Sequence, residues 1–86
     1  QNWPNPFNPA TAIRFELLER AEVRLSVYNL KGQLVNTVAS GLYPAGAHQV
    51  MWDGRDAAGR DAAAGVYLYR LEAGQQVRTM KMTLMR

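Results

Sequence analysis

The chain has no cysteine, only one histidine and only two serines among its 86 residues. Without cysteine there are no disulfides, so a domain of this size has to be stabilised by packing alone. No apolar run approaches the roughly 20 residues of a membrane-spanning helix. The ten basic residues never stand three in a row, and the net charge is only +3. This scatter argues against a nucleic-acid-binding face.

The length predicts one domain, and the 48% hydrophobic content is typical of a folded chain. Because the sequence begins at Gln1 without methionine or a signal peptide, we expect residues 1–86 to be a single domain of a larger protein. Residues 1–10 contain three of the four prolines and predict an extended lead-in. Trp3 and Phe7 are expected to pin this lead-in onto the edge of the core.

From Thr11 onwards apolar residues alternate with polar ones, which predicts half-buried strands separated by turns. The turns include residues 29–32, where Gly32 can take a positive φ. A short strand is expected around residues 34–38, with a connection over residues 41–46. The inward residues of the other strands are expected to be Ile13, Phe15 and Leu17; Val23, Leu25 and Val27; His48, Val50 and Trp52; Tyr67, Tyr69 and Leu71; Met80, Met82 and Leu84.

For the strand near residue 67, the opposite face, Val66 and Leu68, is the alternative, but the tyrosine face buries more apolar area. Phe15, Trp52, Tyr67 and Tyr69 are therefore the expected aromatic core. No segment has a sustained helical period. Short strands spaced by about 8–12 residues predict an all-β antiparallel sandwich.

A segment rich in aspartate and glycine, residues 53–61, separates two of these strands and is called the aspartate loop below. Asp53, Asp56 and Asp61 could gather around a calcium ion, which prefers several oxygen ligands. The spacing does not match an EF-hand, and two arginines in the loop would repel a cation. The alternative is that the aspartates accept backbone N–H bonds in tight turns. No other cofactor is expected.

Catalysis would depend on His48, the only possible imidazole base, with Ser26 or Ser40 as nucleophile. Neither serine lies in a nucleophile elbow, and a half-buried structural histidine is the favoured interpretation. The chain is therefore not expected to be an enzyme. Tyr28 and Tyr43 have no evident core position and are the candidates for stacking on a sugar ring.

The last strand is apolar with two basic residues. It is either an edge strand guarded by charge or an exposed strand that a receptor extends by β-addition. The candidate recognition strand consists of Lys81, Met82, Thr83, Leu84, Met85 and Arg86.

Four blocks of the sequence resemble the C-terminal sorting domains of the type IX secretion system. The blocks are QNWPNPFNPATAIRF (residues 1–15), VYNLKG (27–32), AGAHQVMWDGRD (45–56) with Gly59 and GVYLY (65–69), and KMTLMR (81–86). The middle blocks are similar to the immunoglobulin-like domain of flagellar hook-capping proteins, whereas the first and last favour the sorting family. Alanines at residues 62–64 replace a serine usual in the family, which we expect to alter only the turn.

The resemblance implies an immunoglobulin-like sandwich of about seven strands. It also implies a non-catalytic signal that directs a secreted bacterial parent protein, commonly a hydrolase, across the outer membrane to the cell surface. The implied partners are the outer-membrane secretion machinery and a processing or anchoring enzyme, with the domain itself monomeric. The alternative function is an accessory module that holds a glycoside hydrolase on polysaccharide or the cell wall.

Overall fold

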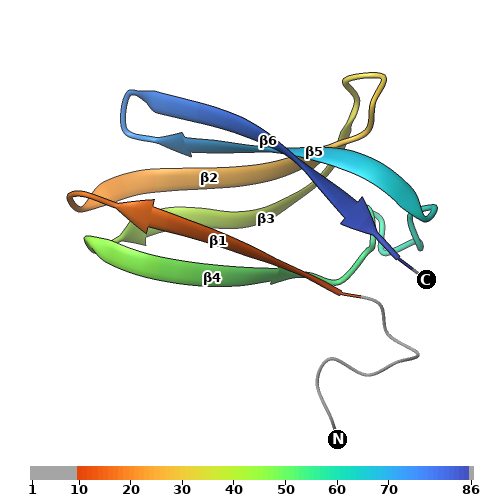
Figure 1. Cartoon of the computed structure of the whole chain (residues 1–86), viewed down its shortest axis with the longest axis horizontal. Coiled ribbons are helices and arrows are strands. Elements are labelled where there is room, and N and C mark those ends of the chain that lie inside the picture. The colour runs from red at the N-terminus through yellow and green to blue at the C-terminus, as the bar shows by residue number, and fades with distance from the viewer. Residues whose placement is uncertain (1–9, 86) are drawn as a thin grey trace, which may run out of the picture.

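The computed structural model describes residues 10–85, which form six antiparallel strands (Figure 1). The strands are β1 (Thr11–Leu17), β2 (Ala21–Tyr28), β3 (Leu34–Tyr43), β4 (Gly46–Trp52), β5 (Gly65–Ala73) and β6 (Gln76–Leu84). Within this part of the chain no helix is long and apolar enough to cross a membrane. The expectations for Trp3 and Phe7 concern residues outside the described range.

The strands are arranged in two sheets, one with the order β1-β4 and one with the order β3-β2-β5-β6. All neighbouring strands pair antiparallel, so the predicted all-β immunoglobulin-like sandwich is confirmed. The resemblance implied about seven strands, and the described residues contain six. The edge strands of the wider sheet are β3 and β6, and the sheet that faces it has two strands.

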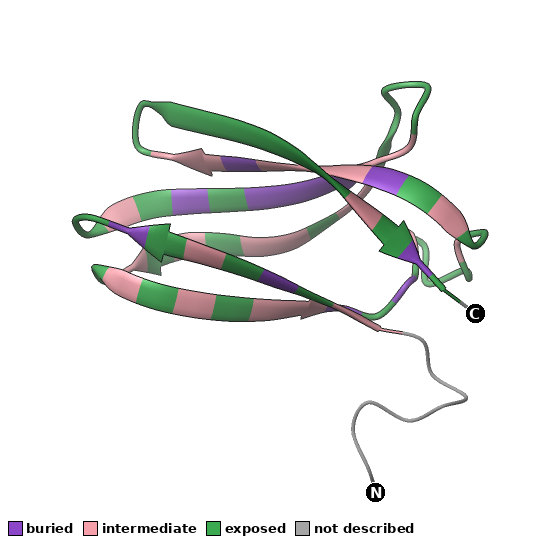
Figure 2. Ribbon diagram, in the orientation of Figure 1, coloured by how far each residue is buried: buried purple, intermediate pink, exposed green. Residues whose placement is uncertain are grey.

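The core lies between the sheets and contains the inward residues of β1, β2 and β5 with the last residues of β4 and β6 (Figure 2). Its buried apolar members are Ile13, Leu17, Val23, Leu25, Val27, Trp52, Tyr67, Leu71 and Leu84. Phe15 and Tyr69 are half-buried and pack against this cluster. The choice of the tyrosine face of β5 is confirmed, because Tyr67 and Leu71 are buried while Val66 is exposed.

The third strand is longer than predicted: β3 continues to Tyr43, into the expected connection at residues 41–46, and the actual connection is residues 44–45. Two register shifts in its pairing with β2 leave Val38 and Val35 without a directly paired residue. Each such bulge adds one residue and interrupts the alternation of faces. The period-two pattern is therefore lost in this region, although the backbone stays extended.

The turn between β2 and β3 forms where it was predicted. The Asn29 side chain accepts hydrogen bonds from the Lys31 and Gln33 N–H groups through Oδ1, at 2.9 and 3.0 Å. Gly32 has a φ of 83°, a conformation that residues with a Cβ rarely adopt. The turn places β3 beside β2, and so orders one half of the wide sheet.

Candidate functional site

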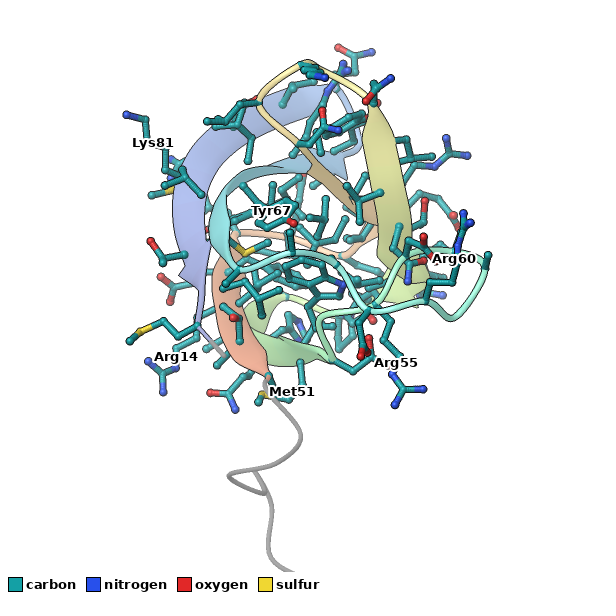
Figure 3. All side chains as sticks on the ribbon, turned by 90° about the vertical axis from the view of Figure 1, so that its right-hand side faces the viewer. Arg14, Met51, Arg55, Arg60, Tyr67 and Lys81 are labelled. Carbon is teal, nitrogen blue, oxygen red and sulfur yellow. The ribbon has the colours of Figure 1, made fainter. Side chains whose placement is uncertain are left out.

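The candidate recognition strand divides into an anchored part and an exposed part. Leu84 is only 1% exposed and belongs to the core, and Met82 is half-buried. Lys81 and Thr83 are exposed, and Met85, just beyond β6, is 77% exposed. Figure 3 shows the Lys81 side chain pointing away from the sandwich. Arg86 lies outside the described residues.

The prediction that Met80 shares a buried face with Met82 and Leu84 is wrong with respect to burial. Met80 lies opposite Tyr69, on the inward side of the sheet, but it is 51% exposed. The facing sheet has two strands and the sheet containing β6 has four. The narrow sheet therefore leaves the first half of β6 uncovered at the rim, and Figure 2 shows most of this strand as exposed.

The aspartate loop folds back onto the edge of β3. The Ala57 N–H donates to the Val35 carbonyl oxygen at 2.9 Å. The Arg55 carbonyl oxygen accepts from Asn36 Nδ2 at 3.0 Å and from the Trp52 indole Nε1–H at 2.9 Å. The loop is therefore attached to both sheets, and it covers the outer edge of the strand that it reaches.

The three aspartates of the loop are engaged within it. Asp53 Oδ1 accepts the Arg55 N–H at 3.1 Å, and Asp61 Oδ1 lies 3.7 Å from Arg55 Nε. Asp56 Oδ1 accepts the N–H groups of Ala58 and Arg60, both at 2.9 Å. Within residues 10–85 no group of three or more His, Cys, Asp or Glu side chains is placed to hold a metal ion. The backbone N–H bonds accepted by Asp53 and Asp56 are those that the turn interpretation predicts.

The backbone N–H of Arg60 is the main cause that lowers the pKa of Asp56, with further help from the Ala58 N–H and the Arg60 guanidinium. Arg60 Nε lies 3.2 Å from Asp56 Oδ2. A carboxyl whose pKa is lower in the folded state stabilises the fold above its unfolded pKa. This stabilisation is lost as the pH falls through the folded pKa.

Asp56→Asn keeps an oxygen acceptor but removes the titration. We expect the variant to melt below the wild type at pH 7, with the difference shrinking as the pH falls below about 4. Thermal melts followed by circular dichroism between pH 7 and pH 2 measure this difference. A difference that stays constant over this range would contradict the role of the Asp56 carboxylate.

Trp52 and Tyr67 connect the loop to the core. Trp52 is 0% exposed, and its ring meets that of Tyr67 edge-on, with centroids 5.1 Å apart and an interplanar angle of 71°. The Tyr67 hydroxyl donates to the Ala63 carbonyl oxygen at 2.5 Å. This bond resembles the tyrosine corner of immunoglobulin-like domains, in which a tyrosine hydroxyl returns to the backbone upstream. Trp52 is thus not available to a ligand.

His48 belongs to a cluster of three rings. Its centroid lies 5.3 Å from that of Phe15 and 5.1 Å from that of Tyr43. His48 Nε2–H donates to the Pro44 carbonyl oxygen at 2.8 Å, which fixes this ring nitrogen as a donor. No hydrogen bond joins His48 to Ser26 or Ser40 in the described part of the chain, so the geometry is that of a structural histidine.

The two tyrosines proposed for sugar stacking are separated in the structure. Tyr43 ends β3 and packs edge-on against Phe15, with ring centroids 5.7 Å apart. Tyr28 ends β2 and pairs with Leu34 and Leu68 on neighbouring strands. Both tyrosines are half-buried, and they do not lie on one shared platform.

The sequence analysis missed the residues that precede Lys81 on the rim. Arg78 is exposed opposite Leu71, and Val77 is 53% exposed opposite Glu72. An apolar residue such as Val77 in an alternating strand gives no local sign that it lies beyond the facing sheet. The available signal was charge, since β6 contains two basic residues and no acidic one.

The six strands in two antiparallel sheets, with a tryptophan and a tyrosine packed between them, define an immunoglobulin-like β-sandwich domain. The family model described as the FlgD Ig-like domain matches residues 5–77. The chain therefore belongs to the FlgD Ig-like domain family, a non-catalytic type of domain. Residues 78–86, which include most of β6, lie beyond the matched segment.

Among solved structures, the chain is similar to FlgD from P. aeruginosa, with 26% sequence identity and a TM-score of 0.71. The similarity covers 87% of this chain and 59% of the P. aeruginosa FlgD chain. The similarity thus spans somewhat more than half of the length of that FlgD chain. No curated protein is significantly similar to it.

Proposed function

We propose that this domain is a sorting signal that directs a secreted parent protein across the outer membrane by the type IX secretion system. The observation that carries the proposal is the set of four sequence blocks, which occur in order along residues 1–86. The first block begins before the FlgD Ig-like match and the last follows it. The FlgD match thus leaves out residues 1–4 of the first block and the whole of the last block, residues 81–86.

The secretion machinery reads the exposed part of β6, and an enzyme that processes or anchors the exported protein acts afterwards at the cell surface. The parent protein is an extracellular hydrolase. The domain directs the transport of this protein and takes no part in its catalysis. In support, Lys81 and Thr83 are exposed while Leu84 is held in the core. A strand fixed by one buried side chain presents its other side chains in a constant register.

The burial of Leu84 determines how the proposal can be tested. Deletion of residues 81–86 would remove Leu84 from the core along with its pairing to Gly65 on β5. Loss of export in such a truncation could then result from unfolding. Whole-domain fusions and surface substitutions avoid this ambiguity.

The test is a reporter protein fused to residues 1–86 and expressed in a bacterium with an active type IX system, beside the reporter without the domain. We expect the fusion in the medium or on the cell surface and the reporter alone in the periplasm, because only the fusion carries the signal. Immunoblots of the fractions measure this distribution. Periplasmic retention of both proteins would contradict the proposal.

Periplasmic retention of the fusion would favour the accessory-module function instead. In that case the isolated domain would bind insoluble glycans, and Tyr43→Ala or Tyr28→Ala would reduce the bound fraction.

A further inference from the structure

The two edge strands of the four-stranded sheet, β3 and β6, differ in the segments that bond to them. At β3, the aspartate loop donates the Ala57 N–H to the Val35 carbonyl oxygen, and Arg55 accepts from Asn36. At the opposite edge, β6 is paired with β5 alone within residues 10–85. Figure 1 shows this strand along the rim of the sandwich. An unpaired edge is a template for another strand.

The side chains along β6 are those of an exposed strand. Val77 and Met80 are 53% and 51% exposed, respectively. Together they place apolar surface on both sides of the strand, since Val77 lies opposite Glu72 and Met80 lies opposite Tyr69. An added strand would remove this surface from water and would bond the backbone groups of the edge that no strand within residues 10–85 pairs with.

The charges of β6 determine which kind of strand can pair with its open edge. The strand contains Arg78 and Lys81 and no acidic residue, and neither side chain forms a salt bridge within the described residues. A second copy paired edge to edge would align two such basic strands, which is unfavourable. The same charges that exclude a second copy attract a strand with carboxylates.

The register of β6 also determines which positions of an added strand would carry the carboxylates. Arg78 lies opposite Leu71, on the inward side, and Lys81 lies opposite Leu68, on the outward side. The two cations are three residues apart, on opposite faces, with Met80 next to Lys81. In an antiparallel partner, an acidic residue opposite Lys81 is followed by an apolar residue opposite Met80. A second acidic residue comes three positions after the first.

We propose that the open edge of β6 binds an extended acidic segment of a partner protein as an added antiparallel strand. The segment has the pattern acidic–apolar–any–acidic–apolar, with its last apolar residue opposite Val77. This inference builds on the proposed function, because it assigns a chemistry to whatever reads β6. It concerns the whole exposed edge from residue 77 to residue 81, not only the final block.

The probe is a fluorescein-labelled nine-residue peptide with Glu-Leu-Thr-Glu-Val at its centre and threonine elsewhere, titrated into the intact domain and followed by anisotropy. We expect saturable binding and a Kd that rises about tenfold or more in the double variant Arg78→Glu/Lys81→Glu, since two attractive pairs become repulsive. The matched control is Lys31→Glu, an exposed charge reversal in the β2–β3 turn. This control is expected to change the Kd less than about twofold.

A peptide with lysine in place of both glutamates tests the charge pairing in reverse. It should bind the double variant better than it binds the wild type. Equal affinity of the acidic peptide for the wild type and the double variant would overturn the proposal, as would an equal loss in Lys31→Glu.

N-methylation separates strand pairing from simple charge attraction. Methyl groups on one alternate set of peptide amides block the backbone bonds to β6, and those on the other set point away from it. We expect one methylated peptide to lose binding and the other to keep it. Retention by both would overturn the strand-addition mode. Failure of the acidic peptide to bind while the reporter fusion is exported would overturn this inference alone, whereas binding without export would contradict the proposed function.

Discussion

Trp52→Ala is expected to lower the free energy of unfolding by about 3–5 kcal/mol, as for other large aromatic residues truncated in a core. The side chain is 0% exposed, and its ring packs edge-on against Tyr67. Its indole N–H also donates to the Arg55 carbonyl oxygen and so attaches the aspartate loop. Because a domain of this kind has a total stability of about 5–15 kcal/mol, this is a large fraction of the whole.

Urea unfolding followed by circular dichroism measures this loss. Trp52→Phe serves as the graded control, because it keeps an aromatic ring in the core and removes the indole donor. The Arg55 carbonyl oxygen retains its bond from Asn36 in that variant, so we expect a smaller loss than for alanine. A loss of unfolding free energy below about 1 kcal/mol in Trp52→Ala would contradict a major contribution of this residue to the stability of the core.

Leu84→Ala is expected to cost about 2–5 kcal/mol, because Leu84 is 1% exposed and its truncation leaves a cavity between the sheets. The neighbouring Met85 provides a matched control, since it is 77% exposed. Met85→Ala is expected to change stability by no more than about 0.5 kcal/mol. Parallel urea titrations of the two variants measure the contrast.

The contrast between these neighbours separates two roles within the candidate recognition strand. A large loss for Leu84→Ala with none for Met85→Ala would assign Leu84 to the fold. Equal, small effects would mean that the end of β6 is not anchored, and the constant register assumed for the exposed side chains would then be lost.

Much of the fold is predictable from the sequence because its signals are local. The alternation of Val23, Leu25 and Val27 with polar residues is a direct consequence of the two-sided geometry of a strand. Gly32 marks its turn because the required φ is unfavourable for other residues. The tyrosine face of β5 follows from apolar area alone.

The errors arise where distant parts of the chain decide the outcome. The bulges at Val35 and Val38 interrupt the alternation of apolar and polar residues, so the sequence pattern does not show how far β3 extends. The exposure of Met80 depends on the facing sheet having two strands, which no local pattern around residue 80 records. The attachment of the aspartate loop to Asn36 is likewise a contact between segments far apart in the sequence.

We propose that the exposed edge of β6, rather than the sandwich as a whole, is the element that the secretion machinery reads. The most direct test is the location of a reporter fused to residues 1–86 with Arg78→Glu/Lys81→Glu, compared with the wild type and Lys31→Glu, after thermal melts have shown equal stability. We predict that the wild-type and Lys31→Glu fusions reach the cell exterior while the double variant stays in the periplasm. Export of the folded double variant at the wild-type level would contradict the claim.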